Sequence, residues 1–192
     1  MKFFWRREEE RHRQIKYQRI LYNSFQPDLY RIVYRMVKDH YLSEDIIQET
    51  FIKLFKNIHR MKDEKHIRKW LTVTATNMAI DFLRDKKRKN ELLAENHYLD
   101  FKSTYPLKKS PVEKAVEDKI IIRSIEKEIS KLPPKYFQVL VLKYECDMKI
   151  NEIAEDLQIS ENTVKTRLFR AKKLLRKNLK ESDDLNLKEV GI

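Results

Sequence analysis

The residues of this sequence best suited to bind a ligand are basic, and a large group of them follows Ser160. Between Glu161 and Lys180 the chain carries eight lysines and arginines and a single acidic residue. Apolar residues recur through the same segment at helical spacing, with Val164 and Leu168 predicted to be buried. Ser160 is a residue type that favours the N-cap of a helix. Such a helix has an apolar stripe for its own domain and a cationic face suited to the major groove of DNA.

The segment before Ser160 predicts a second, shorter helix. Ile150, Ile153 and Leu157 are spaced for one helical face, and the pattern stops there. Two short helices joined by a tight turn, the second of them basic, are typical of a helix-turn-helix. Gln158 occupies the turn, where many such motifs carry glycine to permit a left-handed backbone. The sequence therefore predicts the motif but leaves the geometry of its turn open.

A polar and acidic cluster lies much earlier in the chain. Asp45, Gln48 and Glu49 are spaced to share one face of a helix, displaced from the apolar stripe of that helix. An acidic face would repel phosphates, so on a basic chain it favours a protein partner. The alternatives are ordinary solvated helix residues, or a metal site, which two carboxylates one turn apart without a histidine do not favour.

A third cluster follows on the next predicted helix. Asn77, Asp81 and Arg84 share a polar face, and a run of basic residues comes directly after them. Asn77 offers a donor and an acceptor to a base edge, whereas Asp81 and Arg84 could instead pair with each other. The basic side chains available to neutralise phosphates are Arg84, Lys86, Lys87, Arg88 and Lys89.

Composition limits the elements that can position these residues. The 192 residues include one glycine, Gly191, which leaves none for hairpin turns or phosphate loops, so we predict an all-α chain. The net charge of +12 favours a polyanionic partner. No apolar run approaches the roughly 20 residues that span a bilayer, and the first residues lack an apolar signal segment. We therefore expect a cytoplasmic protein without membrane insertion. Cys146 and five scattered histidines predict neither a disulfide framework nor a metal site.

Helical periodicity divides the chain into two blocks. The predicted segments are an arm at 1–19, a helical domain at 20–90, a linker at 91–110, a second helical domain at 111–180 and a tail at 181–192. Ser43 is expected to cap the second helix, and Ser110 with Pro111 to begin the second domain. The third helix, from about 64 to 88, is predicted to bury Trp70 together with a stripe of five residues. These are Leu71, Ala75, Met78, Ala79 and Phe82.

Two separated stretches together resemble one family. The stretches DIIQETFIKLF, at 45–55, and WLTVTATNMAIDFLR, at 70–84, resemble region 2 of the sigma-70 family. The stretch from LPPKY, at 132–136, to Leu175 resembles region 4. Their order, with only a linker between them, is similar to the extracytoplasmic-function (group IV) sigma factors of bacteria.

The resemblance implies an alternative sigma factor: two small helical domains on a flexible linker, which bind core RNA polymerase through its β′ clamp helices and β flap. Its implied polymerase-binding residues are Asp45, Gln48 and Glu49. Those implied for the minus-10 element are Asn77, Asp81, Arg84, Lys86, Lys87 and Arg88. Those implied for the minus-35 element are Asn162, Thr163, Lys165, Thr166, Arg167, Phe169, Arg170 and Lys173. The resemblance also implies promoter DNA and an anti-sigma factor as partners, with no catalysis, cofactor or metal.

Two other functions remain as alternatives. An autonomous helix-turn-helix regulator would explain residues 132–179 but not the two polar faces before the linker. A magnesium-dependent nucleic-acid enzyme would have to use carboxylates such as Asp45, Glu49 and Asp81.

Overall fold

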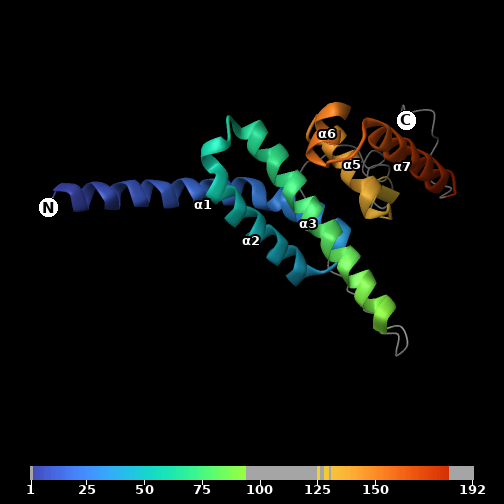
Figure 1. Ribbon diagram of the computed structural model, residues 1–192, viewed down its shortest axis with the longest axis horizontal. Helices are drawn as coiled ribbons and strands as arrows, with labels where there is room; N and C mark the ends of the chain where they lie inside the picture. Colours follow the sequence, from blue (N-terminus) through green and yellow to red (C-terminus); the bar gives the residue numbers. More distant parts are fainter. Residues whose placement is uncertain (1, 94–124, 126–127, 130, 182–192) are drawn as a thin grey trace, which may run out of the picture. The chain divides into compact units, whose positions relative to one another are not determined.

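The computed structural model describes residues 2–93, 125, 128–129 and 131–181. Within these ranges the regular elements are all helical (Figure 1). In order they are α1 (Lys2–Val37), α2 (His40–Asn57), the 3₁₀ turn η1 (Ile58–Arg60), α3 (Glu64–Leu93), α5 (Pro134–Tyr144), α6 (Ile150–Asp156) and α7 (Glu161–Glu181). The all-α fold class is confirmed. The chain divides into two compact units, Met1–Met78 and Ala79–Ile192.

The predicted arm and the first periodic block form one continuous helix, α1, with Pro27 inside it. Pro27 is exposed, which suits a residue that has no amide hydrogen to donate. The buried side of α1 begins at Leu21 and continues through Phe25, Leu29 and Val33. The described residues before Leu21 are mostly exposed. The helix ends at Val37, and the next residue, Lys38, has a φ of 55°, in the left-handed region common just after a helix.

The N-cap of α2 is Asp39, not Ser43 as predicted. The Asp39 Oδ1 atom accepts a hydrogen bond of 3.0 Å from the backbone N–H of Leu42. Ser43 lies one turn inside the helix, fully buried, and its hydroxyl donates to the carbonyl oxygen of Asp39. A carboxylate is as good a cap as a hydroxyl, and here it comes four residues earlier in the chain.

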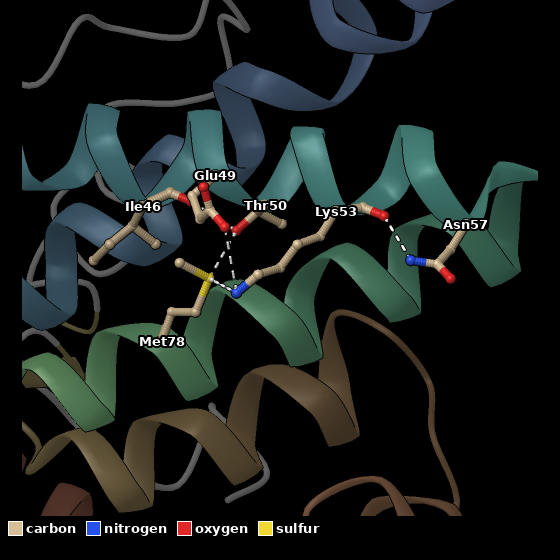
Figure 2. A network of polar contacts seen from close by, with 6 residues as sticks. All are labelled: Ile46, Glu49, Thr50, Lys53, Asn57 and Met78. Carbon is tan, nitrogen blue, oxygen red and sulfur yellow. Dashed lines mark hydrogen bonds and ion pairs between the residues drawn. The ribbon is translucent and has the colours of Figure 1, made fainter.

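Helices α1, α2 and the first part of α3 pack together in the first unit. The rings of Tyr22 on α1 and Phe51 on α2 have centroids 4.7 Å apart. Thr50 and Lys53, both on α2, point toward Met78 of α3 (Figure 2). The Thr50 hydroxyl lies 3.7 Å and the Lys53 Nζ atom 3.5 Å from the Met78 sulfur. Thr50 also donates to the carbonyl of Ile46, so its buried hydroxyl is satisfied within the helix.

The predicted buried stripe of α3 is only partly correct. Leu71, Ala75 and Ala79 are buried, but Met78 is half-buried and Phe82 is 40% exposed. The described residues of α3 after Ala79 are all exposed or half-buried, so the apolar spacing of Phe82 is not matched by packing. Trp70, which we expected in the core, is half-buried.

In the second unit α7 packs against both α5 and α6. Its buried side runs from Val164 through Leu168, Ala171 and Leu175, as the apolar spacing predicted. Leu142 of α5 and Ile153 of α6 are fully buried in the same core. The predicted restart of order at Ser110 and Pro111 lies outside the described residues, as does most of the predicted linker. None of the described helices is both long enough and apolar enough to cross a bilayer.

Candidate nucleic-acid and polymerase interfaces

Helices α6 and α7 form the predicted helix-turn-helix, and Gln158 makes its turn. The φ of Gln158 is 52°, in the left-handed region that glycine usually occupies. Its backbone N–H donates to Glu155 at 3.1 Å, and the N–H of Ile159 reaches back to Ala154 at 2.9 Å. These bonds satisfy the last carbonyls of α6. The turn therefore has the geometry of a glycine-containing motif without the glycine.

Ser160 caps α7 as predicted. Its Oγ atom accepts a hydrogen bond of 3.1 Å from the backbone N–H of Thr163, and the two hydroxyls lie 2.9 Å apart. The cap fixes where α7 begins and so which residues stand at its N-terminal end. In a helix-turn-helix those residues reach the base edges.

The residues predicted to read DNA lie on the side of α7 opposite its buried stripe. Thr163 and Arg167 are half-buried beside it, whereas six residues are exposed. They are Asn162, Lys165, Thr166, Phe169, Arg170 and Lys173. Phe169 is 68% exposed, so this large apolar side chain is not part of the core of its own unit. An exposed aromatic side chain among lysines and arginines suits contact with thymine methyl groups.

A groove of about 380 Å³ lies between the start of α5 and the exposed side of α7. Its lining residues are Lys135, Tyr136, Asn162, Thr163, Thr166, Arg167 and Arg170. The Tyr136 hydroxyl interacts with Arg170, and this interaction, with the nearby charges of Lys135, Arg170 and Arg167, outweighs desolvation and lowers the pKa of Tyr136. Our sequence analysis missed Lys135 and Tyr136. The signal that could have found them is a base next to an aromatic residue at the start of a helix.

Asp45, Gln48 and Glu49 are all exposed on α2, as their spacing predicted. The Glu49 carboxylate lies 3.7 Å from the Lys53 ammonium, an exposed pair that holds little energy. Two large apolar residues extend the same side of the helix. Tyr41, 78% exposed, precedes Asp45 by four residues, and Ile52, 48% exposed, follows Gln48 by four. This α2 face is thus polar at its centre and apolar at both ends, and an exposed aromatic residue such as Tyr41 is of a type enriched in protein interfaces.

On α3 the side chains of Asp81 and Arg84 pair with each other at 3.2 Å. Arg88 pairs with Asp85 at 3.1 Å in the same way. Asn77, one turn before Asp81, is half-buried, whereas Lys86 and Lys87 are exposed. The described part of this face therefore carries a surplus of positive charge, and part of it is already neutralised by neighbouring acids.

In the part of the chain that the structure describes, no group of three or more histidine, cysteine, aspartate or glutamate side chains could hold a metal ion. The described Asp45 and Glu49 have no third ligand of these types beside them.

Comparison with known proteins identifies both blocks. Residues 21–89 match the model of sigma-70 region 2, and residues 122–175 match that of sigma-70 region 4. The ECF RNA polymerase sigma factor SigW of Bacillus subtilis is 36% identical over 160 residues, which cover 82% of this chain and 86% of the relative. This chain belongs to the extracytoplasmic-function sigma factors of the sigma-70 family.

Other relatives of this sigma factor agree. The RNA polymerase sigma factor SigV of Bacillus subtilis is 31% identical over 156 residues, covering 81% of this chain and 87% of the relative. The solved structure of the sigma factor RpoE in complex with the anti-sigma factor NepR, from Bartonella quintana, aligns with a TM-score of 0.59. That alignment covers 83% of this chain and 94% of the other at 16% identity, so it is evidence of a shared fold alone.

Proposed function

We propose that this sigma factor is a dissociable subunit that gives core RNA polymerase its promoter specificity. The observation that carries the proposal is the order of three exposed faces in one chain: the acidic α2 face, the basic α3 face and the helix-turn-helix. An autonomous regulator needs only the last of these. The proposed division is region 2 at 20–90 and region 4 at 111–180, with the linker at 91–110 and the end segments at 1–19 and 181–192.

The α2 face is the proposed polymerase contact. Asp45, Gln48 and Glu49 are exposed. The negative charges of Asp45 and Glu49 are opposite in sign to the net charge of the chain, which suits a basic protein surface such as the β′ clamp helices. Tyr41 and Ile52 would add apolar area to the same contact, and buried aromatic residues often dominate such interfaces. Region 4 would bind the β flap.

The α3 face is the proposed contact to the minus-10 element. Asn77 would bind the edge of an unpaired base, and Arg84, Lys86, Lys87 and Arg88 would neutralise backbone phosphates. Asp81 would orient Arg84 through the pair they form at 3.2 Å. Strand opening then follows from tighter binding to the unpaired state, without catalysis by this chain. The nucleotide chemistry belongs to the polymerase.

The exposed side of α7 is the proposed reader of the minus-35 duplex. Arg170 and Lys165 would bind guanine acceptors, and Phe169 would contact thymine methyl groups. Asn162 and Thr166 can bond base edges near the start of the helix. Thr163, Arg167 and Lys173 lie where they can reach phosphates.

The cell would hold this sigma factor in check with an anti-sigma factor. The structural neighbour RpoE is bound to such a protein, NepR. An anti-sigma factor that covered the α2 face would block polymerase and would be released by the inducing signal. The free sigma factor would then act on promoters in the cytoplasm, at the nucleoid.

A mobility-shift titration with and without core polymerase tests this function against its main rival. With polymerase present, the chain should bind promoter fragments specifically and as one copy per complex. Without polymerase, binding should be weak and insensitive to sequence. Tight, sequence-specific binding by a dimer of the chain alone would establish the autonomous regulator instead.

A further inference from the structure

Tyr136 stands at the start of α5, directly beside the exposed side of α7. It lines the same groove as Asn162, Thr166 and Arg170, so helix α5 contributes to the surface that would face DNA. Because both residues line one groove, the Tyr136 hydroxyl and the Arg170 guanidinium are close enough to interact, and this interaction lowers the pKa of Tyr136. Tyr136 lies on α5 and Arg170 on α7, and the two side chains are close because α7 packs against α5.

Arg170 needs such a partner. Its side chain is exposed, and an unrestrained arginine loses rotamer entropy when binding fixes it. A hydrogen bond to a short, rigid side chain holds the guanidinium before DNA arrives, which reduces this cost on binding. Tyrosine suits the task, because its ring has few rotamers and its oxygen can accept a hydrogen bond while its O–H still donates.

The charges around the groove indicate which chemical group binds in it. The Lys135 ammonium lies 5.2 Å from the centre of the Tyr136 ring, and Arg167 and Arg170 line the opposite wall. The lining contains no acidic residue. Three cations with hydroxyl and amide donors fit a phosphodiester oxygen next to the base that Arg170 contacts.

We infer that Tyr136 is a positioning residue of the minus-35 site, which orients Arg170 toward its base and closes the groove around the adjoining backbone phosphate. The inference rests on the proposed function of α7. It extends the reading surface from the helix-turn-helix to α5. It also implies that the selectivity of Arg170 for its DNA base depends in part on Tyr136, which itself contacts no base.

Helix α5 supplies a matched control. Tyr144 lies two turns after Tyr136, is 59% exposed, and has the Lys172 ammonium 5.5 Å from its ring centre. It does not line the groove. Tyr144→Phe therefore removes the same hydroxyl from the same helix, next to a similar cation, without touching Arg170.

The test is a double-mutant cycle on the specificity ratio of reconstituted holoenzyme. The ratio compares a promoter duplex with the same duplex lacking its minus-35 sequence, for the full chain bound to core polymerase. Tyr136→Phe should lower it about fivefold, the worth of one net hydrogen bond. In an Arg170→Ala background the same change should have no further effect. Tyr144→Phe should leave the ratio unchanged.

Each other result overturns the inference. An unchanged ratio in Tyr136→Phe means that the hydroxyl does not support selectivity. A loss that persists in the Arg170→Ala background means that Tyr136 acts independently of Arg170. A wild-type ratio near one would refute minus-35 reading itself, and would thereby separate failure of the proposed function from failure of this inference.

Discussion

The guanidinium of Arg68 on α3 lies 3.0 Å from the carboxylate of Asp28 on α1. The same guanidinium lies 5.2 Å from the centre of the Phe25 ring, and Arg31 pairs with the other oxygen of Asp28. One carboxylate thus holds two arginines and joins helices that are 40 residues apart in sequence. The pair thus links α1 to α3 within the first unit.

The Asp28 junction should make stability depend on pH. Desolvation raises the pKa of this carboxyl, but the hydrogen bonds and charges of Arg68 and Arg31 outweigh it, so the pKa falls below the ordinary 3.8. The stabilisation is therefore present above pH 3.8 and lost as pH falls through the lower folded-state pKa. Asp28→Asn should lower the free energy of unfolding at neutral pH, and the difference from wild type should shrink in acid. Urea unfolding at several pH values measures it, and a difference independent of pH would contradict this assignment.

The left-handed turn residue predicts a stabilising substitution. Gln158→Gly should raise the free energy of unfolding by up to about 1 kcal/mol, because glycine adopts a positive φ without steric cost. The control is Gln48→Gly inside α2, where the same replacement should cost about 1 kcal/mol. Thermal unfolding measures both. Destabilisation by Gln158→Gly would show that residue 158 does not hold a left-handed backbone in the folded protein.

The N-cap of α7 should matter for both stability and DNA binding. Ser160→Ala removes the acceptor for Thr163 and should cost about 1 kcal/mol, whereas Ser160→Asp should keep most of the stability because aspartate caps equally well. Fraying would begin beside Asn162, so promoter affinity of the holoenzyme should fall in Ser160→Ala and recover in Ser160→Asp. If Ser160→Ala kept the stability and promoter affinity of the wild type, the cap would not be needed.

Much of this architecture could be predicted from sequence, because helical periodicity records which side of each helix is buried. The stripe from Val164 to Leu175 and the exposure of Asp45, Gln48 and Glu49 follow from spacing, and the Ser160 cap follows from its residue type. The spacing of apolar residues along a helix does not indicate where a neighbouring helix ends. Phe82 continues an apolar pattern beyond the buried part of α3, so its exposure could not be predicted.

Two further features lay beyond the sequence for related reasons. Asp39 and Ser43 are equally good caps, and only the hydrogen bond that the Asp39 carboxylate accepts from the Leu42 N–H shows that the helix begins after Asp39. Tyr136 joins Arg170 across two helices, and the packing of α5 against α7 is a tertiary fact that no local pattern contains.

The α2 face makes a prediction about binding. Asp45→Ala combined with Glu49→Ala should weaken the affinity for core polymerase about tenfold or more, since both carboxylates are exposed and would pair with a basic partner. The unfolding temperature should stay unchanged. Glu155→Ala, which removes an exposed acid from α6, is the control and should bind normally. Full affinity in the double variant would place the polymerase contact elsewhere.

Run-off transcription from a library of genomic fragments tests the central claim most directly. Core polymerase with this sigma factor should start transcripts at discrete sites that share a minus-35 and a minus-10 sequence, and core polymerase alone should not. The Asp45 and Glu49 double variant should lose these transcripts while remaining folded. If core polymerase with the wild-type chain starts no specific transcript on any fragment, then the chain does not direct promoter-specific initiation.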